Sequence, residues 1–461
     1  MRVFHSSHSR ETLSITEGTI WKNLLVFFFP IMLGSFFQQM YNTVDAIVVG
    51  NFVGKQGLAA VGSTTSQIIN MAVGFFVGLA SGATVIAAQY YGARMEKELS
   101  RTTHTAMTFA AVGGAIFMVL GLIFSPHMLT LLSTPEDIIE PATTYMRIYF
   151  LGMIPNMIYN IGAGILRAMG DSKRPLFFLI AACFTNVVLD ILMVMGLKMG
   201  VAGAAWATII SQLVSAVLVV REMCRSRGAV HLDFRRLGME PHLLKKIIHI
   251  GLPSGLESVL FTISNMAVTG VINQLGTDSS AATAAFNKED SFYWMLLNAM
   301  SISITTFVGQ NFGARKYDRV KQGVKTGLVL SAIMTVLVIA IMLPGGRLIL
   351  GLFTSDDQVL TIGMEIVKII VPSYILYIFI STLAAAMRGT GNTMIPSVIT
   401  LLGICVVRLI WVYLIVPMNH TIQMINLCYP LSWFITAVIF VVYYLKGKWF
   451  DRAIAHSSVE D

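Results

Sequence analysis

The chain has 461 residues, of which 55% are apolar and only 12% are charged, and its mean hydropathy is positive. Soluble domains carry about 25% charged residues, so this composition excludes an ordinary water-soluble protein. The four cysteines form no CxxC pair, which argues against a metal site or a redox motif. The formal net charge of +8 would suit nucleic acid only if the basic residues formed one patch.

Twelve stretches are long and apolar enough to cross a membrane as helices. Each has at least the roughly 20 residues needed to cross the hydrocarbon core. The sequence therefore predicts an all-α integral membrane protein with twelve transmembrane helices, at residues 20–49, 58–88, 102–125, 138–165, 174–197, 201–221, 245–274, 281–311, 324–345, 359–387, 394–416 and 422–445.

The basic residues follow a topology pattern. Of the 32 lysines and arginines, 25 fall in the even-numbered loops and the two terminal segments, and only Lys55, Lys198 and Arg347 fall in the odd-numbered loops. Cytoplasmic loops are enriched in lysine and arginine, so we expect both termini in the cytoplasm, in a plasma (inner) membrane. The net charge is then explained by topology and by contact with membrane lipids, and no nucleic-acid partner is expected.

Short motifs recur at nearly one spacing, which indicates an internal duplication. The two copies are offset by six predicted helices, an even number, so both halves should have the same orientation in the membrane. The offsets are 221, 221 and 223 residues for the pairs QYYGAR (89–94) and QNFGAR (310–315), RAMGDSKRP (167–175) and RGTGNTMIP (388–396), and WKNLLVFFFP (ending at Pro30) and LKKIIHIGLP (ending at Pro253).

The repeat predicts two pseudo-symmetric six-helix bundles. We call residues 19–222 the N-terminal half and residues 245–446 the C-terminal half. Residues 223–244 are expected to form a cytoplasmic linker, and residues 1–18 and 447–461 cytoplasmic tails.

Asp45 lies inside the first predicted helix, where a charged side chain is costly and suggests function. Gln38 and Asn42 precede it at helical spacing, so one face of this helix is polar and should point into the bundle or a wet cavity. The fifth predicted helix carries Asn186 and Asp190, and the sixth carries Thr208.

These polar positions lie at a similar depth. Asp45, Asp190 and Thr208 are each roughly 8–12 Å from the outer end of their helices at 1.5 Å per residue. Two carboxylates that meet in a medium of low dielectric constant cannot both ionise freely. Such a pair suits a proton site, or a sodium site if oxygens of Asn186 and Thr208 complete the ligation. Asn186 and Thr208 could equally be interhelical hydrogen-bonding residues. Asn160 in the fourth helix is a further candidate for the site or the cavity, with the same alternative.

The two six-helix halves, the YNTVD segment, and the GAR and RxxGDxxxP loops resemble the multidrug and toxic compound extrusion (MATE) transporters of the NorM and DinF type. The resemblance covers roughly residues 15–445. It implies a cation-coupled exporter of small amphipathic, often cationic compounds, without another cofactor. It also places the cation site at Asp45, Asn186, Asp190 and Thr208, and a bend of the first helix at Pro30.

The second half departs from this pattern. Asp45 and Asp190 correspond by offset to Val268 and Trp411, so we expect one coupling site in a molecule that acts as a monomer. Glu257 and Arg408 could meet near the middle of the membrane by helical rise. With Glu289 and Asp290 they could form a buried ion-pair network, which is either static or lines the transport cavity.

Three functions remain to be weighed. A secondary antiporter driven by H⁺ or Na⁺ fits the acidic site and the absence of a GxxxxGK[ST] phosphate-binding loop. A lipid or lipid-linked oligosaccharide flippase of the wider superfamily is the alternative, although such carriers tend to have a strongly basic cavity. An intramembrane enzyme ranks last, because all nine histidines lie in tails, loops or helix ends and no catalytic constellation is evident.

Overall fold

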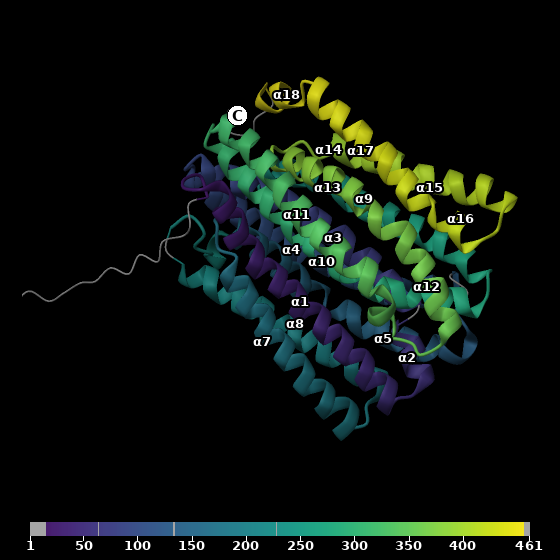
Figure 1. The fold of residues 1–461 in the computed structure, drawn as a ribbon. Coiled ribbons are helices and arrows are strands. Elements are labelled where there is room, and N and C mark those ends of the chain that lie inside the picture. Colours follow the sequence, from purple (N-terminus) through teal and green to yellow (C-terminus); the bar gives the residue numbers. More distant parts are fainter. Residues whose placement is uncertain (1–14, 63, 132–133, 227, 456–461) are drawn as a thin grey trace, which may run out of the picture.

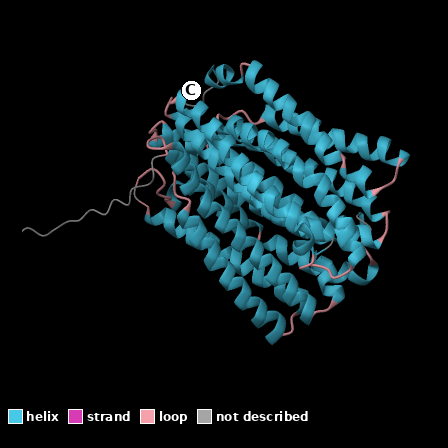
Figure 2. Cartoon of the chain, in the orientation of Figure 1, coloured by secondary structure: helices cyan, strands magenta, loops and turns pink. Residues whose placement is uncertain are grey.

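A computed structural model describes residues 15–62, 64–131, 134–226 and 228–455. Within these residues the chain is helical throughout and contains no strand (Figure 2). Most of the expected N-terminal tail and the end of the expected C-terminal tail lie outside this part of the chain. In Figure 1 the described N-terminal residues and the last helix lie at the same end of the bundle.

The N-terminal half contains long helices interrupted at a few points. Its elements are α1 (Ile20–Phe52), α2 (Lys55–Gly62), α3 (Thr64–Gly92), α4 (Glu96–Leu131), α5 (Glu136–Leu151), α6 (Met153–Ala168), α7 (Lys173–Asp190), the π-helix η1 (Ile191–Gly196) and α8 (Gly200–Arg225), followed in the linker by the 3₁₀ turn η2 (Phe234–Arg236).

The C-terminal half repeats this plan with more interruptions. Its elements are α9 (Pro241–Asn273), α10 (Thr277–Gly313), α11 (Tyr317–Leu350), α12 (Asp357–Ile370), η3 (Val371–Ser373), α13 (Tyr374–Gly389), α14 (Met394–Thr400), η4 (Leu401–Val406), α15 (Val407–Ile410), η5 (Trp411–Ile415), η6 (Val416–Met418), α16 (Ile422–Asn426), α17 (Cys428–Lys446) and α18 (Trp449–Ala455).

Twelve membrane spans are confirmed if one bent helix pair counts as a span. In the described chain, eleven helices are long and apolar enough to cross a membrane, and α5 with α6 forms a twelfth span that is bent by 47°. The bend lies at Gly152, and Pro155 follows in the first turn of α6. Proline has no N–H to continue the hydrogen-bond ladder of α5, which explains the break.

The first helix of each half passes from one hydrophobic core into the other. Leu24, Phe27 and Phe28 of α1 pack in the core of the C-terminal half, whereas Val48 and Val49 pack in the core of the N-terminal half. Helix α9 does the reverse, from the N-terminal core at Ile247 to the C-terminal core at Val268. Both helices contain an internal proline, Pro30 or Pro253, near this crossover.

The two halves touch closely where α3 packs against α9 and α10. A Cβ atom added to Gly82 would lie 2.3 Å from the carbonyl oxygen of Ile247, and one added to Gly92 would lie 2.0 Å from that of Gln310. Only glycine permits the backbones to approach this closely, as in other tightly packed membrane helices.

Two glutamines of the repeated motifs link the halves across this contact. Gln89 Nε2 donates to the carbonyl of Gly389 at 3.0 Å, and Gln310 Nε2 donates to the carbonyl of Ala168 at 2.7 Å. Each glutamine comes from the QxxGAR motif of one half and reaches the RxxG motif of the other half. The repeated motifs are therefore interface residues related by the pseudo-symmetry.

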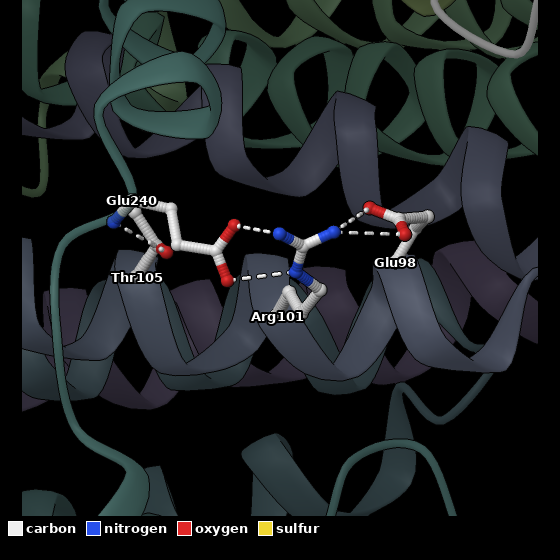
Figure 3. A network of polar contacts seen from close by, with 4 residues as sticks. All are labelled: Glu98, Arg101, Thr105 and Glu240. Atoms are coloured by element: carbon white, nitrogen blue, oxygen red, sulfur yellow. Dashed lines mark hydrogen bonds and ion pairs between the residues drawn. The ribbon is translucent and has the colours of Figure 1, made fainter. Parts of the chain in front are cut away.

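The linker between the halves packs against the N-terminal turns of α4 (Figure 3). The Glu240 carboxylate forms an ion pair with Arg101 at 2.6 Å, and the backbone N–H of Glu240 donates to Thr105 Oγ1 at 3.3 Å. The N–H of Asp233 donates to His104 Nε2 at 3.1 Å. These contacts fix the segment that leads into α9.

Candidate functional site

The two carboxylates expected in the N-terminal half come together. Asp45 on α1 is 6% exposed and Asp190 at the end of α7 is fully buried. Their carboxyl groups are close enough to interact with each other. Asp190 immediately precedes the π-helical turn η1, and such turns occur frequently at functional sites.

The carboxylate pair lacks hydrogen-bond donors. Neither oxygen of Asp190 accepts a hydrogen bond from any described residue, and Oδ1 of Asp45 also accepts none. Ionised carboxylates are acceptors only, so the two groups cannot satisfy each other unless one carries a proton. The arrangement therefore calls for a proton or a metal cation between or beside the two acids.

Asn186 and Thr208, the other two residues of the predicted site, are both buried. Asn186 lies one turn before Asp190, and both atoms of its amide lack a partner among the described residues. Thr208 lies on α8, which packs against α7 and η1, and its hydroxyl donates to the carbonyl of Ala204 at 3.0 Å. Two carboxylates, an amide oxygen and a hydroxyl oxygen are ligands of the hard type that sodium accepts.

The rest of the predicted polar face behaves differently. The side chains of Gln38 and Asn42 are exposed, so only Asp45 of this face is buried. Asn160 donates to the carbonyl and the side-chain oxygen of Asn156, both one turn earlier on α6. Its amide is therefore engaged within its own helix.

Two aromatic residues near Asp45 are not among the site residues that the sequence predicts. Tyr145 and Tyr149 of α5 lie within electrostatic range of Asp45, and the hydroxyl of Tyr149 accepts a hydrogen bond from Gln212 Nε2 at 3.4 Å. The two tyrosines are one helical turn apart, which was the available signal. In a chain rich in aromatic residues that spacing does not distinguish them from other wall residues.

The expected meeting of Glu257 with Arg408 is wrong. Glu257 forms an ion pair with Arg388 at 2.7 Å and also accepts a hydrogen bond from Ser397 Oγ at 2.7 Å. Arg388 follows the predicted span 359–387 directly, and in the structure it lies in the last turn of α13. Equal depth in the membrane does not determine which faces of two helices meet. Here the basic side chain that meets Glu257 is that of Arg388.

The other three charged residues of the predicted ion-pair network form no ion pair with Glu257 or with one another among the described residues. Asp290 is hydrogen-bonded by Tyr374 and by Trp294 Nε1, both neutral donors. Glu289 is 3% exposed, and neither of its carboxylate oxygens has a partner among the described residues. Arg408 donates to Asn265 Oδ1 at 2.8 Å and lies 4.2 Å from the centre of the Tyr429 ring.

No cluster of three or more His, Cys, Asp or Glu side chains suited to a transition metal occurs in the described chain. The donor set around Asp45 and Asp190 is instead oxygen-based. Pro30, the predicted bend, is buried within α1, near the end of the segment that packs in the C-terminal core and well before Asp45.

Comparison with known proteins agrees with the duplicated, all-helical architecture. A family model described as MatE matches residues 30–192 and again residues 253–414. The chain is 28% identical over 396 residues to "Probable multidrug resistance protein YoeA" of Bacillus subtilis, covering 84% of this chain and 85% of that protein. It is 27% identical over 449 residues to "Probable multidrug resistance protein NorM" of Thermotoga maritima, covering 94% of each.

Solved structures show the same fold. A multidrug resistance MATE family transporter in an outward-facing conformation superimposes with a TM-score of 0.88 at 20% identity, over 96% of this chain and 98% of that one. At this identity the likeness concerns the fold alone. The family model, however, matches both halves of the sequence, starting at the two equivalent prolines Pro30 and Pro253. The chain is therefore a member of the MatE family, the multidrug and toxic compound extrusion transporters, and is a multi-pass membrane transporter and not an enzyme.

Proposed function

We propose that this protein is a cation-coupled antiporter that exports small amphipathic, often cationic compounds while H⁺ or Na⁺ enters. The observation that supports this most is the buried pair of carboxylates, Asp45 and Asp190, which has no hydrogen-bond donors in the described chain. A carboxylate in such an environment is strongly destabilised unless it is neutralised. Binding of a proton or a sodium ion removes this cost.

Two modes of neutralisation fit the residues. In the first, one acid takes up a proton and donates a hydrogen bond to the other. In the second, Na⁺ is held by both carboxylates together with the side-chain oxygens of Asn186 and Thr208. Either cation changes the net charge of the site, so its binding and release would shift the balance between conformations.

Helix α1 supplies a route from this site to the other half. Its outer part carries Asp45 in the N-terminal core, and its other end packs in the C-terminal core. Pro30 lies near the end of the part that packs in the C-terminal core, next to Ile31, and lacks the N–H that would stiffen the helix. We infer that bending at Pro30 converts cation binding at Asp45 into relative movement of the halves, which gives alternating access to the substrate.

The relatives named as multidrug resistance proteins support small organic compounds as substrates. The distribution of basic residues supports a location in the plasma membrane with both termini in the cytoplasm. A monomer suffices for this mechanism, because both halves of the alternating unit are present in one chain.

Transport by reconstituted protein tests the coupling. Liposomes containing the purified protein are loaded with a fluorescent organic cation, and a pH gradient and a sodium gradient are imposed separately. We expect Asp45→Asn and Asp190→Asn each to reduce gradient-driven transport by more than about tenfold, because each removes an acid that must bind the cation. Glu140→Gln, which changes an exposed acid of α5, is the matched control and should transport normally.

The outcomes separate the hypotheses. The gradient that drives wild-type transport identifies the ion. Full transport by both Asp variants would remove this site from the mechanism. If the wild type moves no organic cation under either gradient but transfers a fluorescent phospholipid between leaflets, the flippase alternative is correct.

A further inference from the structure

The C-terminal half contains a cavity that the proposed coupling mechanism does not use. Its volume is about 410 Å³, which is within the range of small-molecule sites in proteins. Its walls combine aromatic rings with a few polar groups from helices α9, α10, α15 and α17, and include Phe261, Asn265, Asp290, Trp294, Arg408 and Tyr429.

Arg408 is the unusual member of this wall, because it is fully buried and has no acidic partner. Its Nη1 donates to Asn265 Oδ1 at 2.8 Å and its Nε donates to Ser432 Oγ at 3.3 Å. Its Nη2 has no hydrogen-bond acceptor among the described residues. Rings of Phe261 and Tyr429 lie 5.4 and 4.2 Å from the guanidinium carbon, so their faces partly stabilise the cation.

The one acid of the cavity does not neutralise this arginine by direct contact. Asp290 is within electrostatic range of Arg408, but its two oxygens accept hydrogen bonds from the neutral groups of Tyr374 and Trp294. No ion pair joins Arg408 to a carboxylate in the part of the chain that the structure describes. Arg408 thus lines the cavity with a buried guanidinium that has one donor nitrogen without an acceptor among the described residues.

A ligand can supply the missing partner. Removing a charge from water is costly unless an opposite charge or strong acceptors compensate for the loss. The planar guanidinium matches the geometry of a carboxylate through two parallel hydrogen bonds, and the aromatic walls can hold an apolar ring next to it. Burial of such a ring would add the apolar contribution common to drug-sized ligands.

We propose that this cavity binds aromatic amphipathic compounds through an anionic head group, a carboxylate, which pairs with Arg408. Binding of such compounds in the cavity does not depend on the proposed antiport. Their transport does rest on that proposed function, and it would extend the substrate class from cations to compounds that also carry a negative group. Arg408 would then select substrates by charge.

A matched pair of probes tests this directly. The purified full-length protein in detergent is titrated by calorimetry with 2-naphthoate and with 2-naphthamide, which share shape and apolar area and differ in charge. We expect the wild type to bind naphthoate at least about tenfold more tightly than the amide, and naphthoate to quench the emission of Trp294, which lines the cavity. Equal affinities for the two probes would overturn the proposal without any variant.

Variants assign the preference to Arg408. In Arg408→Gln the preference for naphthoate should disappear while amide binding remains, and in Arg408→Lys it should be reduced because lysine keeps the charge but loses the planar fork. Lys288→Gln removes an exposed positive charge from the same half and should keep the preference. If Arg408→Gln does not fold, the proposal is still tested by the relative affinities of the two probes for the wild type and for Arg408→Lys. A preference that persists in Arg408→Gln would contradict the assignment.

Two further measurements separate related explanations. Asp45→Asn should bind naphthoate like the wild type even if its transport is lost, so failure of the antiport does not mimic failure of this site. Repeating the titration in nanodiscs with and without phosphatidylglycerol tests the other source of an anionic head group. Loss of naphthoate binding in the anionic nanodiscs would identify a lipid as the occupant and overturn the small-molecule carboxylate as ligand.

Discussion

Individual acids in this protein are buried in two different ways. Asp45 and Asp190 face each other without donors, whereas Glu257 is neutralised by Arg388 and hydrogen-bonded by Ser397. An acid with a fixed positive partner gains little from binding a proton, but an acid without one gains a great deal. At this scale the structure therefore distinguishes a candidate coupling pair in the first half from a structural ion pair in the second.

The role of the Glu257–Arg388 pair can be tested by stability. Glu257→Gln should reduce the free energy of unfolding by about 1–3 kcal/mol, because a partly buried guanidinium loses its counter-ion. The double variant Glu257→Gln with Arg388→Gln should recover part of this loss. Thermal unfolding of the purified protein in detergent measures both.

Glu365→Gln provides the control for this comparison, since that carboxylate accepts a hydrogen bond from the exposed Gln423 and forms no ion pair among the described residues. We expect it to change stability by less than about 1 kcal/mol. An unchanged melting temperature for Glu257→Gln would show that the ion pair is not structural and would direct attention to a transport role.

At the scale of helices, the contact between halves depends on backbone proximity in α3. Gly82 lies against the backbone of α9, and a methyl group there would overlap the carbonyl of Ile247. Gly270 of α9, in contrast, has open space around its Cβ direction. Helical propensity is the same for the two positions, so differences between their alanine variants report on packing.

Gly82→Ala and Gly270→Ala form a matched pair of variants. Gly82→Ala should destabilise the protein by about 1–3 kcal/mol, because the clash is with backbone that cannot rotate away. Gly270→Ala should be neutral or stabilising by up to about 1 kcal/mol, because alanine favours helix. Thermal unfolding monitored by tryptophan fluorescence compares the stability of the two variants. Equal changes in stability would mean that the α3–α9 contact is not as close as the glycine positions indicate.

At the scale of the whole molecule, the two halves are held together by reciprocal contacts. Gln89 reaches the C-terminal half and Gln310 reaches the N-terminal half, and α1 and α9 each begin in the core of the opposite half and end in the core of their own. Under the proposed alternating access, rocking of the halves would break the glutamine hydrogen bonds at one end of the bundle while α1 and α9 stay anchored at both ends. We therefore propose that the crossing helices act as hinges and the glutamines as closing contacts.

Removing both glutamine side chains should favour separation of the halves at this end. A hydrogen bond contributes about 1 kcal/mol, so Gln89→Ala with Gln310→Ala should shift the balance toward the open form by about 30-fold. Spin labels are attached at Lys97→Cys and Lys325→Cys in a background without native cysteines. Pulsed electron paramagnetic resonance then measures the distance between the two halves. Gln322→Ala, at an exposed glutamine, is the control. An unchanged distance distribution in the double variant would contradict a closing role.

The sequence by itself determined the number of spans, the duplication and the pairing of acids in the first half. This was possible because lipid leaves the backbone only helical solutions, so apolar length reveals each span, and because a repeat places equivalent residues at equivalent depth. Asp45 and Asp190 stand out for the same reason, since few charged residues are tolerated at that depth.

Only the tertiary structure decided which side chains meet. Glu257 pairs with Arg388 and not with Arg408, Asn160 turns to its own helix, and α1 begins in the opposite core. These facts depend on the rotation, tilt and bending of packed helices. Helical rise gives depth but says nothing about azimuth, so residues at one level can still face in different directions.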